Sequence, residues 1–268
     1  MLTDTHCHLN ILAKEKFDVL LQENDYQNLP TIINAAKQKN ISKIINVGTS
    51  LIESLNCLAL AKKFSSVWAT VGIHPNDLTS TWQADLKELA SYLPHKTQNK
   101  IVGIGECGLD FYYPGYDFNR QRDGFRAQIE LALKYNLPLS IHTRVAPQET
   151  LRILEEYVKN KITGVIHCFS EDLDFAKQVI EWRFVLGIGG IITYPKNHNL
   201  RTIVQNITLD DFVLETDSPY LPIQTRRGKI NYPEYIYDIA LYISNLKNCT
   251  LDQLANATNK NVKKIFQI

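Results

Sequence analysis

Seven side chains of types that bind metal ions stand at the ends of short apolar runs in this chain of 268 residues. They are five of the seven histidines and two acids: His6, His8, His74, Glu106, His142, His167 and Asp217. Imidazole nitrogens and carboxylate oxygens bind divalent ions, and such ions activate water for hydrolysis. If the runs bring these side chains to one place, the sequence predicts metal-assisted hydrolysis.

The spacing of His6 and His8 suits a shared metal ion. Side chains alternate across a strand, so these two imidazoles point the same way and Cys7 points the other way. A lone H-x-H triplet is more often incidental than functional. Further ligand candidates at equivalent positions of other strands reverse that balance.

Two carboxylates occupy positions where burial is costly without a partner. Glu106 closes the apolar run 101–106, and Asp217 directly follows the run 212–216. Binding to a cation removes the cost of burying each charge. The alternatives are a helix N-cap or an exposed loop position for Glu106, and a helix cap or a turn before proline for Asp217.

Two more histidines, His142 and His167, each end a run rich in β-branched residues. Either one alone could be a hydrogen-bonded core histidine, but on adjacent strands they form a candidate pair. Arg144 stands two residues after His142, and its guanidinium suits a phosphate or a carboxylate. An ordinary structural ion pair is the alternative for this arginine.

The elements that must position these residues are eight apolar runs, each the length of a buried strand. They span residues 2–6, 43–48, 67–73, 101–106, 138–142, 163–167, 184–188 and 212–216. Each is followed by a segment long enough for a helix, such as residues 119–135. Eight such units in about 250 residues match a closed (β/α)8 TIM barrel, in which the strand ends converge on the active-site face. A doubly wound open sheet is the alternative.

Length and composition fit one domain that spans residues 1–268. Because 29 basic residues nearly balance 28 acidic ones, any contact with nucleic acid must be local. The sequence starts without the basic and apolar segments of a signal peptide, and no run is long enough to span a membrane. Five scattered cysteines without a C-x-x-C pair indicate reduced thiols. We therefore expect a cytoplasmic protein.

One motif in the sequence is misleading. Residues 103–108 satisfy G-x-G-x-x-G after a strand, but a dinucleotide-binding turn opens directly into a helix. Here residues 109–115 follow, which we interpret as a loop broken by Pro114. The chain also lacks the G-x-S-x-G motif of serine hydrolases and the phosphate-binding loop of nucleotide hydrolases.

Taken together, six segments resemble one known family. They are Asp4-Thr5-His6-Cys7-His8, Val71-Gly72-Ile73-His74-Pro75, Gly105-Glu106-Cys107-Gly108-Leu109-Asp110, Ile141-His142-Thr143-Arg144, His167-Cys168-Phe169-Ser170 and Glu215-Thr216-Asp217-Ser218-Pro219-Tyr220-Leu221. In this order they resemble the TatD-type deoxyribonucleases, which are metal-dependent hydrolases of the amidohydrolase-like kind. The resemblance runs from residue 4 through Arg227-Gly228-Lys229 to the helices that follow.

The resemblance implies a (β/α)8 barrel that binds two divalent ions, zinc, magnesium or manganese. His6, His8 and Asp217 would hold one ion, and His142 and His167 the other. Glu106 would bridge them, and Glu106 and Asp217 would be the catalytic residues. The resemblance also implies exonucleolytic hydrolysis of DNA, usually from the 3′ end. We expect single-stranded DNA or 3′ ends as the substrate, a monomeric protein and no contact with membranes.

We expect the substrate phosphates to contact His74, Arg144 and Lys196, with a solvated surface position as the alternative for Lys196. Three positions depart from the residues usual in the family, and they put substrate contacts in doubt: Val145, Glu171 and Tyr232. The rival enzyme is a barrel metallohydrolase acting on an amide, ester, lactone or phosphotriester, since the same ligands serve all of these reactions. A non-enzymatic binding protein would require lost ligands, and none is lost.

Overall fold

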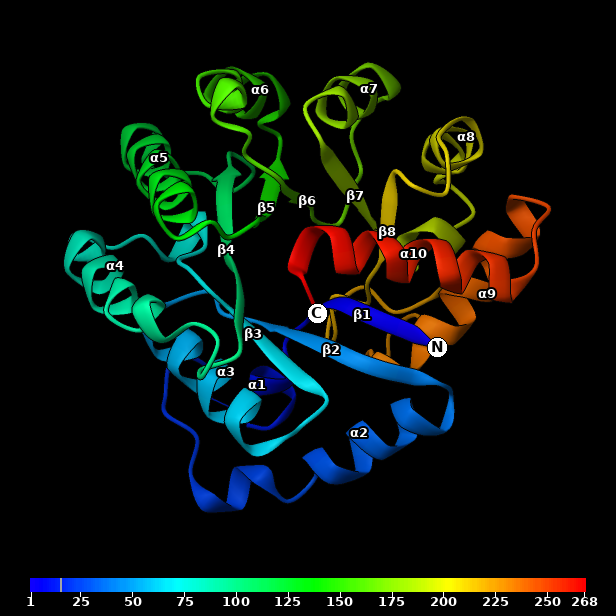
Figure 1. The fold of residues 1–268 in the computed structure, drawn as a ribbon, viewed down its shortest axis with the longest axis horizontal. Helices are drawn as coiled ribbons and strands as arrows, with labels where there is room; N and C mark the ends of the chain where they lie inside the picture. The colour runs from blue at the N-terminus through cyan, green and yellow to red at the C-terminus, as the bar shows by residue number, and fades with distance from the viewer. Residues whose placement is uncertain (15) are drawn as a thin grey trace.

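Eight parallel strands in sequence order form the centre of the computed structural model, which describes residues 1–14 and 16–268 (Figure 1). The strands are β1 (Leu2–Cys7), β2 (Ile41–Val47), β3 (Val67–Val71), β4 (Ile101–Asp110), β5 (Leu139–Arg144), β6 (Gly164–Ile166), β7 (Phe184–Ile188) and β8 (Phe212–Leu214). The first and last strands meet where Asp217 N donates to His6 O at 2.9 Å and His8 N donates to Ser218 O at 2.7 Å. The predicted (β/α)8 TIM barrel is confirmed.

Helices surround the sheet, as Figure 1 shows. They are α1 (Leu9–Leu12), α2 (Leu29–Gln38), α3 (Leu51–Lys63), α4 (Trp82–Ala90), α5 (Phe118–Tyr135), α6 (Pro147–Glu155), α7 (Leu173–Glu181), α8 (His198–Asn206), α9 (Ile236–Leu246) and α10 (Leu251–Phe266). Short 3-10 helices are η1 (Glu23–Tyr26), η2 (Pro75–Asp77), η3 (Leu93–His95), η4 (Val158–Asn160), η5 (Gly190–Thr193), η6 (Gln224–Arg226) and η7 (Pro233–Tyr235). None of the described helices combines the length and apolarity needed to cross a bilayer.

Side-chain caps explain where several helices begin. The Asp117 carboxylate accepts from Arg120 N at 2.9 Å, and Asp172 does the same for Phe175 N at 2.8 Å. Such caps satisfy N–H groups that have no partner within the first turn of a helix. Helix α5 therefore starts at Phe118, next to the predicted start of 119–135.

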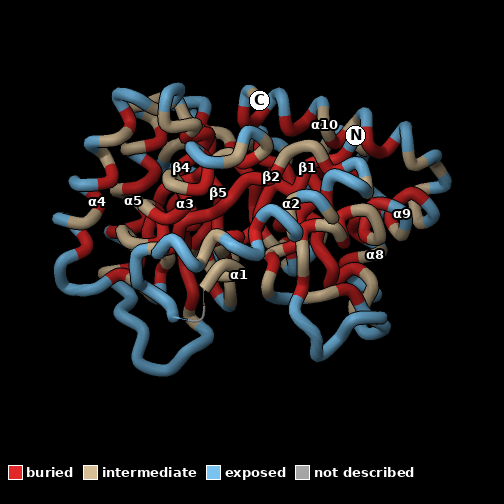
Figure 2. Tube along the Cα trace, turned by 90° about the horizontal axis from the view of Figure 1, so that it is seen from below, coloured by how far each residue is buried: buried red, intermediate tan, exposed pale blue. Residues whose placement is uncertain are grey.

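Helix α10 closes the barrel at the end away from the predicted ligands. Its Val262, Ile265 and Phe266 pack against buried inward-facing strand residues such as Val102 and Val213. Figure 2 shows α10 and both chain termini at one end, and long exposed loops at the opposite end. One end of the barrel is thus sealed by apolar packing, and the loops after the strands are left to build a site.

Strand β4 differs from its prediction, because it continues past Glu106 to Asp110. Leu109 and Asp110, expected in a loop, pair with Thr143 and Arg144 of β5 and are buried. This additional pairing with β5, together with the burial of Leu109, favours a strand over a loop at these residues. No helix follows before Phe118, so the rejection of a dinucleotide-binding turn is unaffected.

Candidate metal centre

The strand ends that carry the predicted ligands surround a cavity of about 650 Å³. The predicted ligands that line it are His8, Glu106, His142, His167 and Asp217. His6 is fully buried beneath them. Residues from five different strands or strand ends are thereby brought to one place, as convergence in a barrel requires.

The first group of donor atoms joins β1 to Glu106 and Asp217. Nε2 of His6 lies 3.2 Å from Nε2 of His8 and 3.3 Å from Oε2 of Glu106. Asp217 Oδ1 lies 3.4 Å from Nε2 of His8 and 3.8 Å from Nε2 of His6. The alternation of β1 thus turns both imidazoles toward one point, and Cys7 packs into the core.

The second group lies on the other oxygen of the same glutamate. Nδ1 of His142 is 2.9 Å from Oε1 of Glu106, and Nε2 of His167 is 3.9 Å from that oxygen. The two oxygens of Glu106 therefore face different histidine pairs. This is the arrangement that a bridging carboxylate needs.

The spacing of these atoms fits metal ligands. Zinc–nitrogen and zinc–oxygen distances are about 2.0–2.2 Å, so two ligands at angles of about 90–110° lie roughly 2.9–3.5 Å apart. The distances of 3.2, 3.3 and 3.4 Å within the first group fall in this range. A cluster of histidines and acids that is nearly free of solvent also needs a cation to balance its desolvation cost.

Polar groups outside the cluster orient three of the imidazoles, two by hydrogen bonds and one by an ion pair. Val47 O lies 2.9 Å from Nδ1 of His8, and Ser140 Oγ lies 3.2 Å from Nδ1 of His6. Nδ1 of His167 lies 3.0 Å from Oε1 of Glu215, close enough for an ion pair although it lacks a well-aligned hydrogen-bond partner. In each ring Nε2 is left to face the cluster.

His142 is oriented the opposite way. Its Nδ1 faces Glu106, and its Nε2 lies 3.2 Å from Oδ2 of Asp110. Asp110 also accepts from Asn76 Nδ2 at 3.0 Å. Asp110 therefore holds this ring from the side that does not face Glu106.

Shifts in pKa keep the carboxylate of Glu106 charged and the imidazole of His6 neutral. Burial opposes ionisation of Glu106, but His6, His142 and His167 together hold its pKa well below the usual value. Burial, with His167 nearby, lowers the pKa of His6. An ionised carboxylate and a neutral imidazole are the forms that bind metal ions.

The candidates for phosphate contact do not all lie at the cavity. His74 and Arg144 line it, whereas Lys196 is exposed between η5 and α8 and is not part of the lining. Burial and the adjacent His142 lower the pKa of His74 to about 3, so its ring is neutral at neutral pH. Because Nδ1 of His74 accepts from Asn76 N at 3.2 Å, Nε2 carries the proton.

Arg144 is held by aromatic faces. Its guanidinium lies 3.6 Å from the ring centre of Tyr112, and its Nη1 donates to Tyr113 Oη at 3.4 Å. Within the described part of the chain, no carboxylate forms an ion pair with it. The structural ion pair considered from the sequence is therefore absent among these residues, and the charge is left available to an anion.

Three residues at the centre were missed from the sequence: Asp110, Ser140 and Glu215. Glu215 and Asp110 both belong to motifs that resemble the family, but neither was given a role. The signal for Glu215 was an acid that directly follows the apolar residues 212–214, the same signal that identified Asp217. Ser140 offered no such signal, since a serine in a strand is common.

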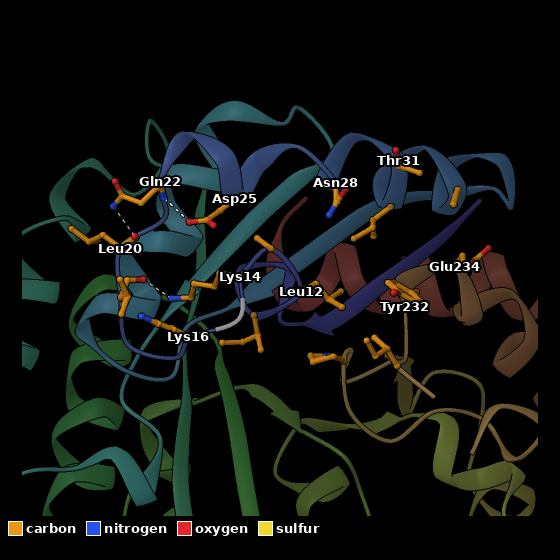
Figure 3. Close-up of a pocket in the computed structure, with 17 residues that line it drawn as sticks. Leu12, Lys14, Lys16, Leu20, Gln22, Asp25, Asn28, Thr31, Tyr232 and Glu234 are labelled. Atoms are coloured by element: carbon orange, nitrogen blue, oxygen red, sulfur yellow. Dashed lines mark hydrogen bonds between the residues drawn. The ribbon is translucent and has the colours of Figure 1, made fainter. Parts of the chain in front are cut away.

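A larger cavity of about 1110 Å³ lies beside the centre and contains none of the predicted ligands (Figure 3). Its lining includes Leu12, Lys14, Leu20 and Tyr232. We locate the chemistry in the smaller cavity, because that is where the donor atoms converge.

The chain matches a known family over almost its whole length. Residues 3–267 match the family described as TatD related DNase. The chain is 32% identical over 268 residues to the uncharacterized metal-dependent hydrolase YabD of Bacillus subtilis, and the match covers 100% of both chains. It is also 32% identical to the uncharacterized metal-dependent hydrolase YcfH of Escherichia coli, covering 100% of this chain and 96% of that relative.

A solved structure agrees with these matches. The crystal structure of YJJV, a TatD homolog from Escherichia coli K12, superposes with a TM-score of 0.90 at 27% identity. The superposition covers 100% of this chain and 98% of that one. Sequence and structure comparisons thus agree on the same family.

Proposed function

Because this chain belongs to the TatD related DNase family of metal-dependent hydrolases, we propose that it is a deoxyribonuclease that removes nucleotides from the 3′ end of DNA. The observation that carries the proposal is the convergence of four imidazoles on the two oxygens of Glu106, with Asp217 beside three of these imidazoles. Such a cluster suits the activation of water for attack on an ester of phosphoric acid.

His6, His8 and Asp217 would hold one divalent ion, and His142 and His167 a second, with Glu106 between them. Zinc, magnesium and manganese are all compatible with mixed nitrogen and oxygen ligands. When bound, such ions supply a water of lowered pKa and neutralise charge that develops on the phosphate.

The chain's own residues supply binding and proton transfer. Asp217, whose Oδ1 lies beside His6 and His8, would accept a proton from the attacking water. His74 and Arg144 both line the cavity. The neutral ring of His74 would donate a hydrogen bond from Nε2 to a phosphate oxygen, and Arg144 would offer its guanidinium to another. Lys196 stays a candidate for a more distant phosphate, since it is exposed outside the cavity lining.

The proposed substrate is single-stranded DNA or a frayed 3′ end, because an unpaired strand can enter a cavity of about 650 Å³ whereas a duplex is too wide. The protein would act as a monomer. We also propose a cytoplasmic setting, because all five cysteines are free thiols in the structure.

An assay on end-labelled oligonucleotides tests the proposal. Metal-loaded protein should shorten a single strand labelled at its 5′ end in steps of one nucleotide and release a 3′ label first. A chelator should stop the reaction, and added Mn²⁺ or Zn²⁺ should restore it. Glu106→Gln, which keeps the size of the side chain but removes its charge, serves as the inactive control.

The assay has outcomes that contradict the proposal. Internal cleavage, or release from the 5′ end, would disprove the exonuclease direction. Turnover of a lactone or an amide without any cleavage of DNA would disprove the nuclease and favour the rival metallohydrolase.

A further inference from the structure

The loop after α1 places an aromatic side chain at the metal cavity. Phe17 lines this cavity and is 49% exposed. Lys14 and Leu20 of the same loop line the larger neighbouring cavity (Figure 3). The loop therefore forms part of the wall of both cavities, and Phe17 is the one of its described residues that lines the metal cavity.

Exposed apolar side chains that gather around a cavity mark a binding site, whereas single scattered ones do not. Apart from Met1, Leu241 and Phe118, the first residue of α5, the large apolar residues that are exposed in the described chain lie in loops after β1, β4, β5 and β8. Those at the metal cavity include Tyr113 and Tyr220. Flat apolar faces at the mouth of a phosphodiester site suit the faces of unpaired nucleobases.

One face of α3 fixes this loop. Oε1 of Glu53 accepts from Lys14 Nζ at 2.7 Å and from Asp18 N at 2.6 Å. Ser50 Oγ donates to Asp18 Oδ1 at 2.7 Å, and Asn56 Nδ2 donates to Val19 O at 2.9 Å. The residues that hold the loop follow one another at intervals of three along the helix, so they lie on one side of it.

Glu53 is the centre of this clamp. Its carboxylate is completely buried, and its other oxygen accepts from Asn10 Nδ2 and Asn56 Nδ2. The backbone of Asp18, the residue next to Phe17, is thus tied to a rigid helix by a charged acceptor. The clamp removes freedom from the loop before any substrate arrives, which reduces the entropy cost of binding.

We infer that Phe17 is a substrate-binding residue that contacts an unpaired nucleobase at the metal cavity, and that Glu53 is the positioning residue that holds it there. The inference rests on the proposed function for its substrate. It extends that function in two ways. The loop after β1 contacts the nucleobase, and helix α3, through Glu53, holds this loop in position.

Binding measurements test the role of Phe17. Fluorescence anisotropy of labelled oligothymidylate and of an abasic oligonucleotide of equal length is measured with the full chain in chelator, so that no cleavage occurs. Phe17→Ala should weaken binding of oligothymidylate about tenfold, within the range known for base stacking, and leave abasic binding unchanged. Phe17→Tyr should bind like the wild type. Leu20→Ala, on the same loop but at the other cavity, is the matched control and should change nothing.

The role of Glu53 is tested separately. Glu53→Ala should weaken oligothymidylate binding as much as Phe17→Ala does, and the double variant should be no weaker than either one. In the metal-loaded enzyme both single variants should raise KM more than they lower kcat. Amide hydrogen exchange of residues 16–21 should rise in Glu53→Ala, with the barrel strands still protected, and Lys62→Ala on the same helix should not raise it. If Glu53→Ala does not fold, Asp18→Ala tests the clamp without changing α3.

The outcomes separate this inference from the proposed function. If DNA is cleaved but Phe17→Ala leaves binding unchanged, or weakens abasic and base-bearing strands equally, the inference is wrong and the nuclease stands. If the effects of Phe17→Ala and Glu53→Ala add, Glu53 does not act through Phe17. If the wild type neither binds nor cleaves DNA, both proposals fall.

Discussion

The carboxylate of Glu215 lies 3.0 Å from Nδ1 of His167 and thereby selects Nε2 as the nitrogen that faces Glu106. Oε1 of Glu215 also accepts from Cys168 N at 2.6 Å, which ties the carboxylate to the backbone after β6. The pair matters because burial lowers the pKa of His167, yet Glu215 and Glu106 overcome that effect and raise it to about 10. Glu215 thus fixes both the direction and the basicity of this ring.

Weakening this pair should weaken metal binding. Glu215→Gln should lower the affinity for the second ion by roughly 10- to 100-fold, the usual cost of losing an outer partner of a metal ligand. Gly187→Ala should have a similar effect, because a Cβ at Gly187 would lie 2.2 Å from Oε2 of Glu215. Competition with a fluorescent chelator measures the affinities. Gly189→Ala is the matched control, because a Cβ there would make only ordinary van der Waals contact, 3.4 Å from Glu215 O. Unchanged affinity in both test variants would rule out this role for Glu215.

Substitution of a proposed metal ligand should lower activity more than substitution of Glu215. His6→Ala and Glu106→Ala should each reduce DNA hydrolysis by more than the roughly 100-fold limit expected for outer partners. Both should lower the bound metal measured by elemental analysis, while the circular dichroism of the barrel is retained. Full activity in both variants would overturn the assignment of the centre.

A comparison of Arg144 and Lys196 shows which of these two basic side chains contacts the substrate phosphate. Arg144→Ala should raise KM for oligonucleotides about tenfold, since it removes the cation that faces the cavity. Lys196→Ala should have a smaller effect on KM that disappears in high salt, because this lysine is exposed. Steady-state kinetics at two ionic strengths separates the cases. Equal, salt-independent effects would place Lys196 in direct contact with substrate after all.

Glu53 gives the stability of the fold a predictable pH dependence. Burial opposes its ionisation, but hydrogen bonds from Lys14, Asn10 and Asn56 lower its pKa below the ordinary value of 4.5. A carboxyl whose pKa is lower in the folded state stabilises the fold above the unfolded pKa, and this contribution is lost as the pH falls toward the folded pKa. The difference in unfolding free energy between wild type and Glu53→Gln should therefore be largest near pH 7 and shrink below about pH 4.5. Urea unfolding at several pH values measures it, and a difference that stays constant would contradict the lowered pKa.

Strand periodicity was sufficient to predict the barrel and the side-chain directions that bring the candidate ligands together. The alternation along β1 predicted that His6 and His8 face the same point, and their nitrogens lie 3.2 Å apart. The end of each apolar run identified where Glu106 and Asp217 would stand. These predictions succeeded because a buried strand leaves few choices for which way a side chain points.

Features that depend on contacts distant in sequence were not predictable in the same way. The path of the loop that carries Phe17 is set by Glu53 on α3, 36 positions later in the sequence. Both alternatives for Lys196, a phosphate contact and a solvated surface position, were open from the sequence, because the choice depends on the direction of the loop after η5. Leu109 and Asp110 became strand residues only because β5 pairs with them. Tertiary contacts of this kind override local sequence signals.

The proposed function depends on two cations bound on either side of Glu106. Anomalous diffraction from crystals of the protein loaded with Mn²⁺ would locate them. We predict two peaks, one among His6, His8 and Asp217 and one between His142 and His167, each adjacent to a different oxygen of Glu106. A single peak, or peaks that do not contact Glu106, would rule out a two-ion centre bridged by this carboxylate.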